Sequence, residues 1–251
     1  MSGSSLEPHS WHTFTTKAFQ LLSPPMLVSV IIPVLNEETF IQAAIGAARA
    51  DSDLDEVEII VVDGGSQDAT LRLVPPDVKV IHSKPNRGKQ MNLGAEHSTG
   101  EILVFCHADS LLPKGWRAAV ITALSKDKVS GGTFQLSIVP ARGILKLRNR
   151  IKYPANWRFM FGDQVQFMTR RTFEKAGGFN EIPIMEDLEM SRALHALGRL
   201  VRIPLRVRTS SRRFSGDKPR QQWWLSIKCV ILYLYFGKSA EEINILYYQR
   251  N

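Results

Sequence analysis

The stretch LVSVIIPVLNEE, residues 27–38, decides the fold class, because a run of mostly β-branched apolar side chains ends abruptly in polar ones. A continuous apolar run of this length predicts a strand that is buried on both faces of a sheet. Residues 39–49 then place apolar side chains at helical spacing. A buried strand followed directly by a helix is the repeating unit of α/β proteins with parallel sheets.

The same unit recurs along the first half of the chain. Apolar runs at residues 57–62, 78–81 and 101–105 predict three more strands, and helical segments are expected around residues 69–73 and 88–98. Such alternation predicts a parallel sheet covered by helices on both faces. Ligands of these sheets bind where the strands end at their carboxyl termini. Four polar groups follow the predicted strands at that edge, at residues 36–38, 63–68, 86–89 and 107–109.

The pattern changes after residue 130. Residues 131–136 and 161–168 predict strands, a basic amphipathic stretch lies between them, and helices are expected over residues 171–176 and from about Glu186 to Leu197. Gly198 is a suitable residue to end the last of these helices. The chain is therefore interpreted as one domain of two halves, residues 26–130 and 131–251.

Composition limits the possible functions. The chain of 251 residues has a net charge of +8, with Lys and Arg concentrated in residues 142–158 and 199–220. That distribution suits a phosphate-bearing ligand, a nucleic acid or an anionic lipid. The glycine motifs of dinucleotide-binding folds and P-loops are absent, so neither nicotinamide cofactors nor ATP hydrolysis is indicated. The two cysteines, Cys106 and Cys229, lie in apolar runs and are predicted to be buried thiols in a reducing compartment.

Both ends of the chain call for interpretation. Residues 1–25 lack the continuous apolar core of a signal peptide, and we interpret them as an N-terminal extension. Residues 223–236 are apolar and aromatic, but Lys228 interrupts them and they are too short to span a membrane. They predict either a helix packed on the domain or a helix at a membrane surface.

The stretch FCHADS, residues 105–110, ends the fourth predicted strand with an imidazole and a carboxylate. Alternate residues of a strand point to the same side, so His107 and Asp109 can converge on one small object. That object is predicted to be a metal ion.

Three other polar clusters have simple structural explanations when each is taken alone. Asp63 and the glycines after it suit a tight strand-to-helix turn closed by an acid. The cations of residues 84–90 form either a solvated loop or a site for an anion such as a diphosphate. The acids of residues 186–189 complement the dipole at the start of a helix.

The order of these motifs is more specific than any one of them. SVIIPVLNEE, VVDGGSQDAT, NRGKQMNLGA, the acid-bearing turn after a strand, GDQVQFM with the later GGF, and the Glu186-Asp187 pair together resemble the family 2 glycosyltransferases over residues 27–200. The resemblance implies a GT-A fold, a mainly parallel Rossmann-like sheet flanked by helices, with a C-terminal helical segment. It also implies inverting transfer from a nucleotide-sugar donor. Residues 26–130 become the nucleotide-sugar-binding half, and residues 131–251 the acceptor side with the C-terminal helices.

The resemblance assigns roles to individual positions. Asp109 matches the last acid of the family's Asp-x-Asp motif, which holds Mn²⁺ or Mg²⁺, while His107 is either a ligand or a hydrogen-bonding neighbour. Asp187, paired with Glu186, matches the general base. The acceptor side includes Gly162, Asp163 and Gln164. The donor side is expected to comprise Pro33, Asn36, Glu38, Asp63, Gly65, Arg87 and Gln90.

These roles suit the chemistry of inverting transfer. A carboxylate takes the proton of the attacking hydroxyl, and a hard cation offsets the charge of the departing diphosphate. The Gln-x-x-Arg-Trp motif of processive synthases is absent, since Gln221-Gln222-Trp223-Trp224 lacks the arginine. We therefore expect metal-dependent transfer of a single sugar, with a UDP-sugar favoured as donor.

The partners follow from the same observations. The acceptor is hypothesised to be a lipid or polyprenoid, reached from the cytoplasm at a membrane surface through the C-terminal helix, and no nucleic acid is expected. A nucleotidyltransferase would need a basic, glycine-rich loop after the first strand, where this chain is acidic. The alternative is a basic nucleotide-, nucleic-acid- or membrane-binding module of the same fold without catalysis.

Overall fold

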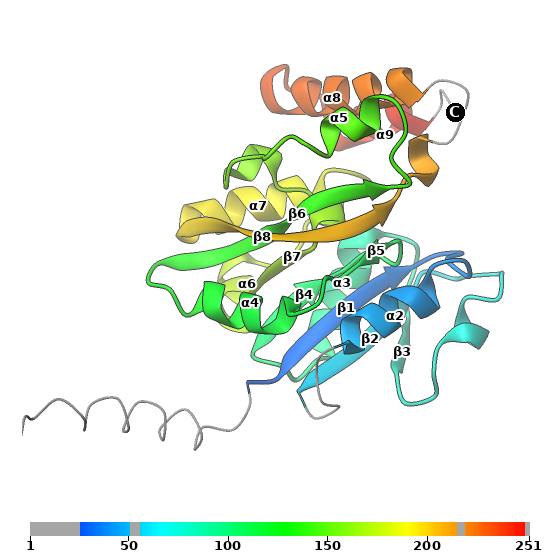
Figure 1. Cartoon of the computed structure of the whole chain (residues 1–251), viewed down its shortest axis with the longest axis vertical. Helices are drawn as coiled ribbons and strands as arrows, with labels where there is room; N and C mark the ends of the chain where they lie inside the picture. The colour runs from blue at the N-terminus through cyan, green and yellow to red at the C-terminus, as the bar shows by residue number, and fades with distance from the viewer. Residues whose placement is uncertain (1–25, 51–55, 215–218, 249–251) are drawn as a thin grey trace, which may run out of the picture.

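A computed structural model of the chain describes residues 26–50, 56–214 and 219–248 (Figure 1). The N-terminal extension expected over residues 1–25 lies outside the described residues. The described strands form one eight-stranded sheet in the order β3-β2-β1-β4-β7-β6-β8-β5. The strands are β1 (Val28–Val34), β2 (Val57–Asp63), β3 (Lys79–His82), β4 (Ile102–Phe105), β5 (Ser110–Leu111), β6 (Val129–Val139), β7 (Gln166–Thr169) and β8 (Arg199–Ser210).

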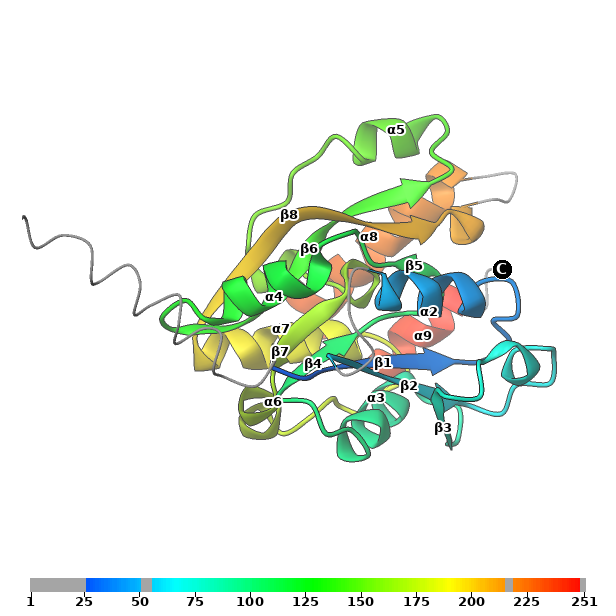
Figure 2. The ribbon, with the colours of Figure 1, turned by 60° about the horizontal axis from the view of Figure 1, so that its bottom comes forward.

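Helices cover the sheet on both faces and form a cap at one end (Figures 1 and 2). The α-helices are α2 (Ile41–Arg49), α3 (Arg87–Glu96), α4 (Trp116–Leu124), α5 (Ile144–Arg148), α6 (Arg170–Ala176), α7 (Glu186–Leu197), α8 (Pro219–Tyr235) and α9 (Ala240–Tyr248). Short 3₁₀ turns are η1 (Leu71–Leu73), η2 (Trp157–Phe159), η3 (Gly162–Gln164) and η4 (Arg212–Phe214). None of the helices in the described ranges is both long and apolar enough to cross a membrane.

The first half confirms the expected parallel arrangement. Strand β1 lies between β2 and β4 and runs parallel to both, with Val28 opposite Val57 on one side and Ile102 on the other. The polar residues that follow these strands consequently meet at one edge. The helix expected around residues 69–73 is wrong: only the turn η1 forms there. Prolines at 75 and 76 prevent the helix from continuing.

The second half adds antiparallel strands, so the sheet is mixed. Strand β7 runs antiparallel to both β4 and β6, and β8 runs parallel to β6 and antiparallel to β5. The strand expected at residues 161–168 begins only at Gln166. The residues before it form η3, and Val165 adopts a φ of 56° that no strand residue can have.

Strand β8 was not expected from the sequence. Its apolar side chains, among them Val201, Ile203 and Val207, alternate with arginines, which is the pattern of a strand with one face toward the core. The many arginines in this segment instead suggested a basic surface. Strand β8 ends beside the turn after β4, because Ser110 pairs with Thr209 and the Ser210 N–H donates to the Asp109 carbonyl over 3.0 Å.

The core has one cluster on each face of the sheet. A third cluster lies between α7 and the helical cap, which consists of α8 and α9. Trp116 is fully buried on the face covered by α2 and α4, and Phe105 packs with Phe173 and Phe179 on the other. The third cluster includes Leu188 of α7, Cys229 of α8 and Ile243 of α9. Helix α8 is therefore packed on the domain, as one of the two interpretations of residues 223–236 predicted. Both cysteines are buried free thiols, which confirms their predicted burial.

Candidate active site

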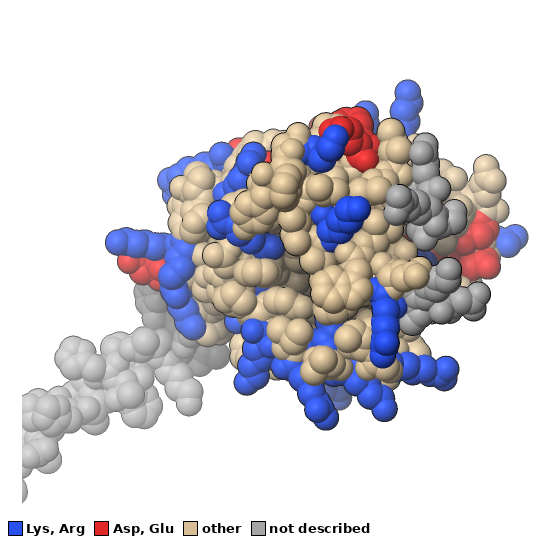
Figure 3. All heavy atoms as spheres, turned by 90° about the horizontal axis from the view of Figure 1, so that it is seen from above, with Lys and Arg blue, Asp and Glu red and all other residues tan. Residues whose placement is uncertain are grey.

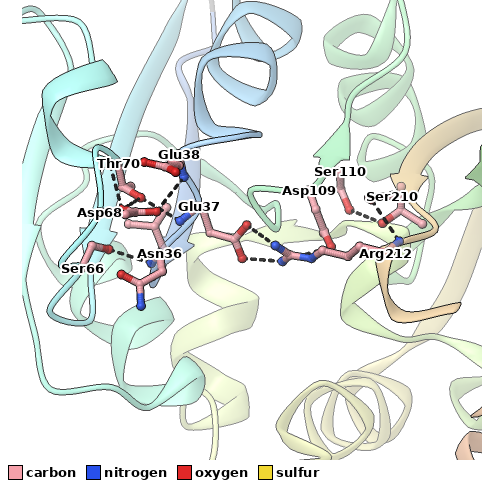
Figure 4. A network of polar contacts seen from close by, with 12 residues as sticks. Asn36, Glu37, Glu38, Ser66, Asp68, Thr70, Asp109, Ser110, Ser210 and Arg212 are labelled. Carbon is pink, nitrogen blue, oxygen red and sulfur yellow. Dashed lines mark hydrogen bonds and ion pairs between the residues drawn. The ribbon is translucent and has the colours of Figure 1, made fainter. Parts of the chain in front are cut away.

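Two loops form one wall of the site, at the carboxyl ends of β1 and β2 (Figure 4). The Asn36 N–H donates to Ser66 Oγ over 2.9 Å, and Asn36 Oδ1 accepts from the Gln67 N–H over 2.8 Å. The Ala69 N–H donates to Glu38 Oε2 over 2.9 Å, and the Glu38 N–H donates to Asp68 Oδ2 over 3.2 Å. Asn36 and Glu38 thus join the loops while remaining exposed at the surface.

Asp63 and Gln90 stabilise this wall through hydrogen bonds to backbone groups at the ends of β1 and β2. Asp63 is 2% exposed, and its carboxylate accepts from the N–H groups of Gly65 and Ser66, while His82 Nδ1 lies 3.5 Å away. Gln90 Nε2 donates to the Val34 and Val62 carbonyls at the ends of β1 and β2. Gly65 has a φ of 99°, which favours glycine, and Pro33 is partly buried within β1. The turn after Asp63 is therefore closed by its own carboxylate.

His107 and Asp109 line one cavity, but the strand alternation that suggested this does not apply, because β4 ends at Phe105 and a turn carries both residues. Burial and the nearby arginines Arg87, Arg213 and Arg212 hold the pKa of His107 well below its usual range. Its imidazole is therefore neutral and able to accept a bond at a ring nitrogen.

Arg212 connects this turn to the wall formed by the loops after β1 and β2, and it was not among the predicted site residues. Its guanidinium donates to both carboxylate oxygens of Glu37, over 2.6 and 2.5 Å, and lies 3.4 Å from Asp109 Oδ2. Figure 4 shows Arg212 between these two acids. Hydrogen bonding to Glu37 raises the pKa of Arg212, so its charge is permanent. The sequence offered one signal for this residue: Arg212 and Arg213 follow shortly after residues 199–210, whose apolar side chains alternate as in a strand.

Helix α7 begins with the predicted general base. Asp187 Oδ2 accepts from the Gly162 N–H over 2.7 Å, and Asp187 Oδ1 accepts from the Leu188 N–H over 2.7 Å. Glu186 is 1% exposed and pairs with Arg87 Nη1 at 2.8 Å. Burial, and then the negative charge of Glu186, raise the pKa of Asp187 to about 7. The cations predicted at residues 84–90 thus include one, Arg87, that neutralises an acid of this pair.

The backbone around the carboxylate is unusually constrained. A Cβ on Gly162 would lie 2.7 Å from His107 Nε2 and 3.3 Å from Asp187 Oδ2, so only glycine lets both side chains approach. Four non-glycine residues of the described chain have positive φ, and three of them are at this site: Asn36, Val165 and Met185. Such strain persists only where surrounding structure enforces it, and it clusters at functional sites.

The predicted acceptor-side residues divide into two kinds. Gln164 is buried, and its Oε1 accepts from Arg202 Nη1 over 2.5 Å, so it supports the site structurally. Asp163 faces the cavity, and its buried Oδ1 has no hydrogen-bond partner among the described residues. Burial raises the pKa of Asp163. An unpaired buried carboxylate oxygen is costly, so a ligand hydroxyl or cation is its natural partner.

A cavity of about 540 Å³ joins these groups to the helical cap. Its polar end is formed by Arg87, His107, Asp109, Asp163 and Asp187. Its walls are largely apolar and include Phe159, Phe161, Ile184, Trp223, Ile227, Val230, Ile231 and Leu234. The cavity can hold an elongated apolar molecule with one polar end against the carboxylates.

The structure brings most predicted residues to one region. Of these, Arg87, His107, Asp109, Asp163, Gln164, Glu186 and Asp187 line the cavity. The predicted donor-side residues belong instead to the adjacent wall after β1 and β2, and they are Pro33, Asn36, Glu38, Asp63, Gly65 and Gln90. Sequence reasoning missed the cavity-lining arginines Arg148, Arg158 and Arg213. They lie in the segments whose excess of basic residues was recognised without any assignment to a site.

The mixed sheet, its flanking helices and a site beyond the strand ends define a protein of the GT-A fold. Residues 29–177 match the sequence model of the family described as "Glycosyl transferase family 2". The chain therefore belongs to glycosyltransferase family 2.

Curated relatives match part of the chain. A prophage bactoprenol glucosyl transferase homolog of Escherichia coli strain K12 is 28% identical over 165 residues, which are 56% of this chain and 54% of that protein. Glycosyltransferase AglE of Haloferax volcanii is 31% identical over 107 residues, 39% of this chain and 35% of that protein. The chain spans about half the length of the first curated relatives that it matches.

Solved structures match the fold over nearly the whole chain. Residues 1–349 of TarS from S. aureus superpose with a TM-score of 0.61 at 19% identity, covering 90% of this chain and 71% of that one. The mannosyltransferase PcManGT from Pyrobaculum calidifontis superposes with a TM-score of 0.62 at 19% identity, covering 94% and 76%. At this level of identity the likeness establishes the fold.

Proposed function

We propose that this chain transfers one sugar from a nucleotide-sugar donor to an acceptor hydroxyl, with inversion at the anomeric carbon. The observation that carries the proposal is the position of Asp187. Its carboxylate lines the polar end of an apolar cavity, together with His107 and Asp109 of the turn after β4. A general base, a donor-side wall and an acceptor-shaped cavity are the parts that this reaction needs.

Asp187 has the properties of a general base. Its raised pKa, about 7, makes it a stronger proton acceptor than an exposed carboxylate while it is still largely ionised just above neutral pH. The Gly162 N–H fixes Oδ2. In the proposed reaction Asp187 takes the proton of the acceptor hydroxyl as its oxygen attacks the anomeric carbon and the bond to the diphosphate breaks.

The donor is proposed to lie along the wall formed by Pro33, Asn36, Glu38, Asp63, Gly65 and Gln90, with its diphosphate toward Arg87 and Arg212. Arg212 already carries a permanent positive charge at the junction of this wall and the cavity. A UDP-sugar is favoured, in line with the solved complexes of TarS with UDP and UDP-GlcNAc. PcManGT was solved with GDP-Man, so the base of the donor has to be tested directly.

A divalent cation fits this site only together with the donor. No group of three or more His, Cys, Asp or Glu side chains that could hold a metal occurs in the described ranges. Asp109 offers a carboxylate and His107 a neutral imidazole, so donor phosphate oxygens would complete the set. We propose Mn²⁺ or Mg²⁺, in line with the Mn²⁺ of the PcManGT complex. When bound, the cation supplies Lewis-acid stabilisation of the leaving diphosphate.

The acceptor is proposed to be a lipid alcohol or polyprenoid. The cavity walls from η2 and α8 are apolar, and the arginines Arg148, Arg158 and Arg213 line the same cavity. Apolar walls beside cations suit an amphiphile with an anionic group. Two of the relatives are named as bactoprenol glucosyl transferases, and these names point to the same class of acceptor.

Calorimetric titration tests the donor site. UDP, with GDP for comparison, is titrated into the full chain with and without Mn²⁺, and the titration is repeated on Asp109→Ala. We expect UDP to bind only with the metal, and binding to be lost in the variant. Asp187→Asn is the matched control, since removing the base should slow transfer by about 10²- to 10⁴-fold and leave UDP binding intact.

Each other result has a defined meaning. Tight binding of UDP by Asp109→Ala in the presence of Mn²⁺ would remove Asp109 from the metal site. Absence of binding by either nucleotide would overturn the enzymatic proposal and favour a binding module of the same fold.

A further inference from the structure

The end of the molecule that carries α5, α8 and α9 has an unusual surface. Nine of the thirteen exposed large apolar side chains in the described part of the chain lie in these helices, directly after α8, or in the segment between α5 and η3. They are Leu147, Ile151, Phe159, Trp224, Ile231, Tyr235, Phe236, Ile245 and Tyr248. Scattered apolar residues need no explanation, but a concentration of this kind marks an interaction surface.

The outer side of α8 concentrates this property in one stripe. Arg220, Trp224, Lys228, Ile231 and Tyr235 are all exposed, and their spacing of three or four residues places them on one face of the helix. The opposite side, which includes Cys229, packs on α7 and α9. Cations with Trp, Ile and Tyr on one stripe are typical of a helix that lies in a membrane interface.

The charge around this stripe has a single sign. Residues 140–162 and 219–240 contain no Asp or Glu. In the first of these segments Lys146 and Arg150 are exposed beside Leu147 and Ile151. Figure 3 shows this end of the molecule, where Lys and Arg surround a largely uncharged centre and acidic side chains appear only in a few places nearer the edge. The acids that directly follow these two segments are Asp163, which faces the cavity, and Glu241, and Lys238 pairs with Glu242.

The mouth of the cavity opens on the same surface. Ile231, Tyr235 and Tyr248 each line the cavity, and each is also exposed, Tyr235 to 64%. Arg148 and Tyr153, from α5 and the segment after it, also line the cavity. A molecule leaving the cavity at this point passes the exposed side chains of α8 and α9.

We propose that this surface, the exposed stripe of α8 together with Lys146, Leu147, Arg150 and Ile151, docks on an anionic phospholipid bilayer. The apolar side chains enter the interface, and the cations meet the headgroup charge, which no acid in either segment opposes. Docking places the cavity mouth against the bilayer, so an apolar acceptor reaches Asp187 without crossing water. This last step rests on the proposed function, whereas the docking itself does not.

Vesicle sedimentation tests the docking without any sugar donor. The full chain is mixed with phosphatidylcholine vesicles that contain or lack phosphatidylglycerol, at low and high salt. We expect sedimentation with the anionic vesicles and its loss as salt rises. Lys228→Ala should weaken vesicle affinity roughly fivefold, and Trp224→Ser about tenfold. UDP titration of both variants should match that of the unchanged chain, because neither residue belongs to the donor side.

Matched controls lie at the other end of the molecule. Leu197→Ser and Lys126→Ala change exposed side chains of the same kinds, at the end of α7 and after α4, and should leave vesicle affinity unchanged. The proposal is overturned if the chain does not sediment with anionic vesicles at low salt, or if the controls weaken binding as much as Trp224→Ser. A dimer on size-exclusion chromatography that Trp224→Ser dissociates, with no vesicle binding, would assign the surface to a second copy instead.

Discussion

At the residue scale, the Glu186-Asp187 pair sets the pH dependence of the proposed reaction. The carboxylate form of Asp187 accepts the proton, and its pKa is raised to about 7, so kcat/KM should fall about tenfold per unit as pH drops below 7. Glu186→Gln removes a negative neighbour, lowers the pKa of Asp187 and should move this limb to lower pH. Asp187→Asn should reduce kcat by about 10²- to 10⁴-fold. The measurement is kcat/KM against pH for the unchanged chain, Glu186→Gln and Asp187→Asn. If Glu186→Gln leaves the acidic fall of kcat/KM at the same pH, Glu186 does not raise the pKa of Asp187.

Gly162 is the second residue on which the site geometry depends. A methyl group at this position would displace the imidazole of His107 and crowd Asp187. Gly162→Ala should therefore reduce kcat by roughly 10²-fold, the cost of a misplacement of about 1 Å. Steady-state kinetics and circular dichroism together separate this from unfolding.

Gly46→Ala is the matched control for this substitution. A Cβ on Gly46, within α2, meets no described atom within 4 Å. This variant should keep its activity and gain up to about 1 kcal/mol of stability, because alanine favours a helix over glycine. Equal activity of Gly162→Ala and Gly46→Ala would show that the close approach at Gly162 is dispensable.

At the element scale, the turn between α4 and β6 stores strain that has no part in the site. Lys128 is exposed, has a φ of 59°, and its carbonyl accepts from the Arg199 N–H over 2.7 Å. Glycine adopts this conformation without the Cβ clash, which costs about 1–2 kcal/mol. Lys128→Gly should raise the midpoint of thermal unfolding by roughly 2–4 °C per kcal/mol gained.

Lys126→Gly provides the comparison within the same turn. Its φ is not positive, so glycine there only adds freedom to the unfolded chain and should lower the midpoint. A rise in both variants would show that removal of a positive charge, and not release of backbone strain, is responsible.

At the scale of the whole molecule, donor binding should stabilise a fold whose two halves meet at the site. Arg212 joins Glu37, 175 residues away in the chain, and Asp109 lies beside both. UDP with Mn²⁺ at one hundred times its dissociation constant should add about 2.7 kcal/mol to the free energy of unfolding. Thermal melts should then rise by roughly 5–10 °C. UDP alone and Mn²⁺ alone should each give far smaller shifts.

The first half of the fold and the order of its polar turns could be predicted from the sequence. Continuous runs of β-branched residues predict buried strands. The carboxyl ends of parallel strands lie at one edge of the sheet. For this reason His107 and Asp109 could be predicted as site residues from the strand pattern, whereas Asp187 was predicted only through the family resemblance. Burial of both cysteines followed from the same local pattern.

Tertiary structure alone decided how the second half completes the site. The late start of β7 and its antiparallel pairing with β4 and β6 depend on contacts between segments far apart in the chain. The pair Arg212-Arg213 is visible in the sequence, but only the tertiary structure shows that Arg212 lies 3.4 Å from Asp109. The sequence determined which strands and polar turns form, because those follow from local patterns of side chains. Pairing with β6 and β5 decided where β8 ends, and with it which arginines meet the carboxylates and which apolar face of α8 remains uncovered.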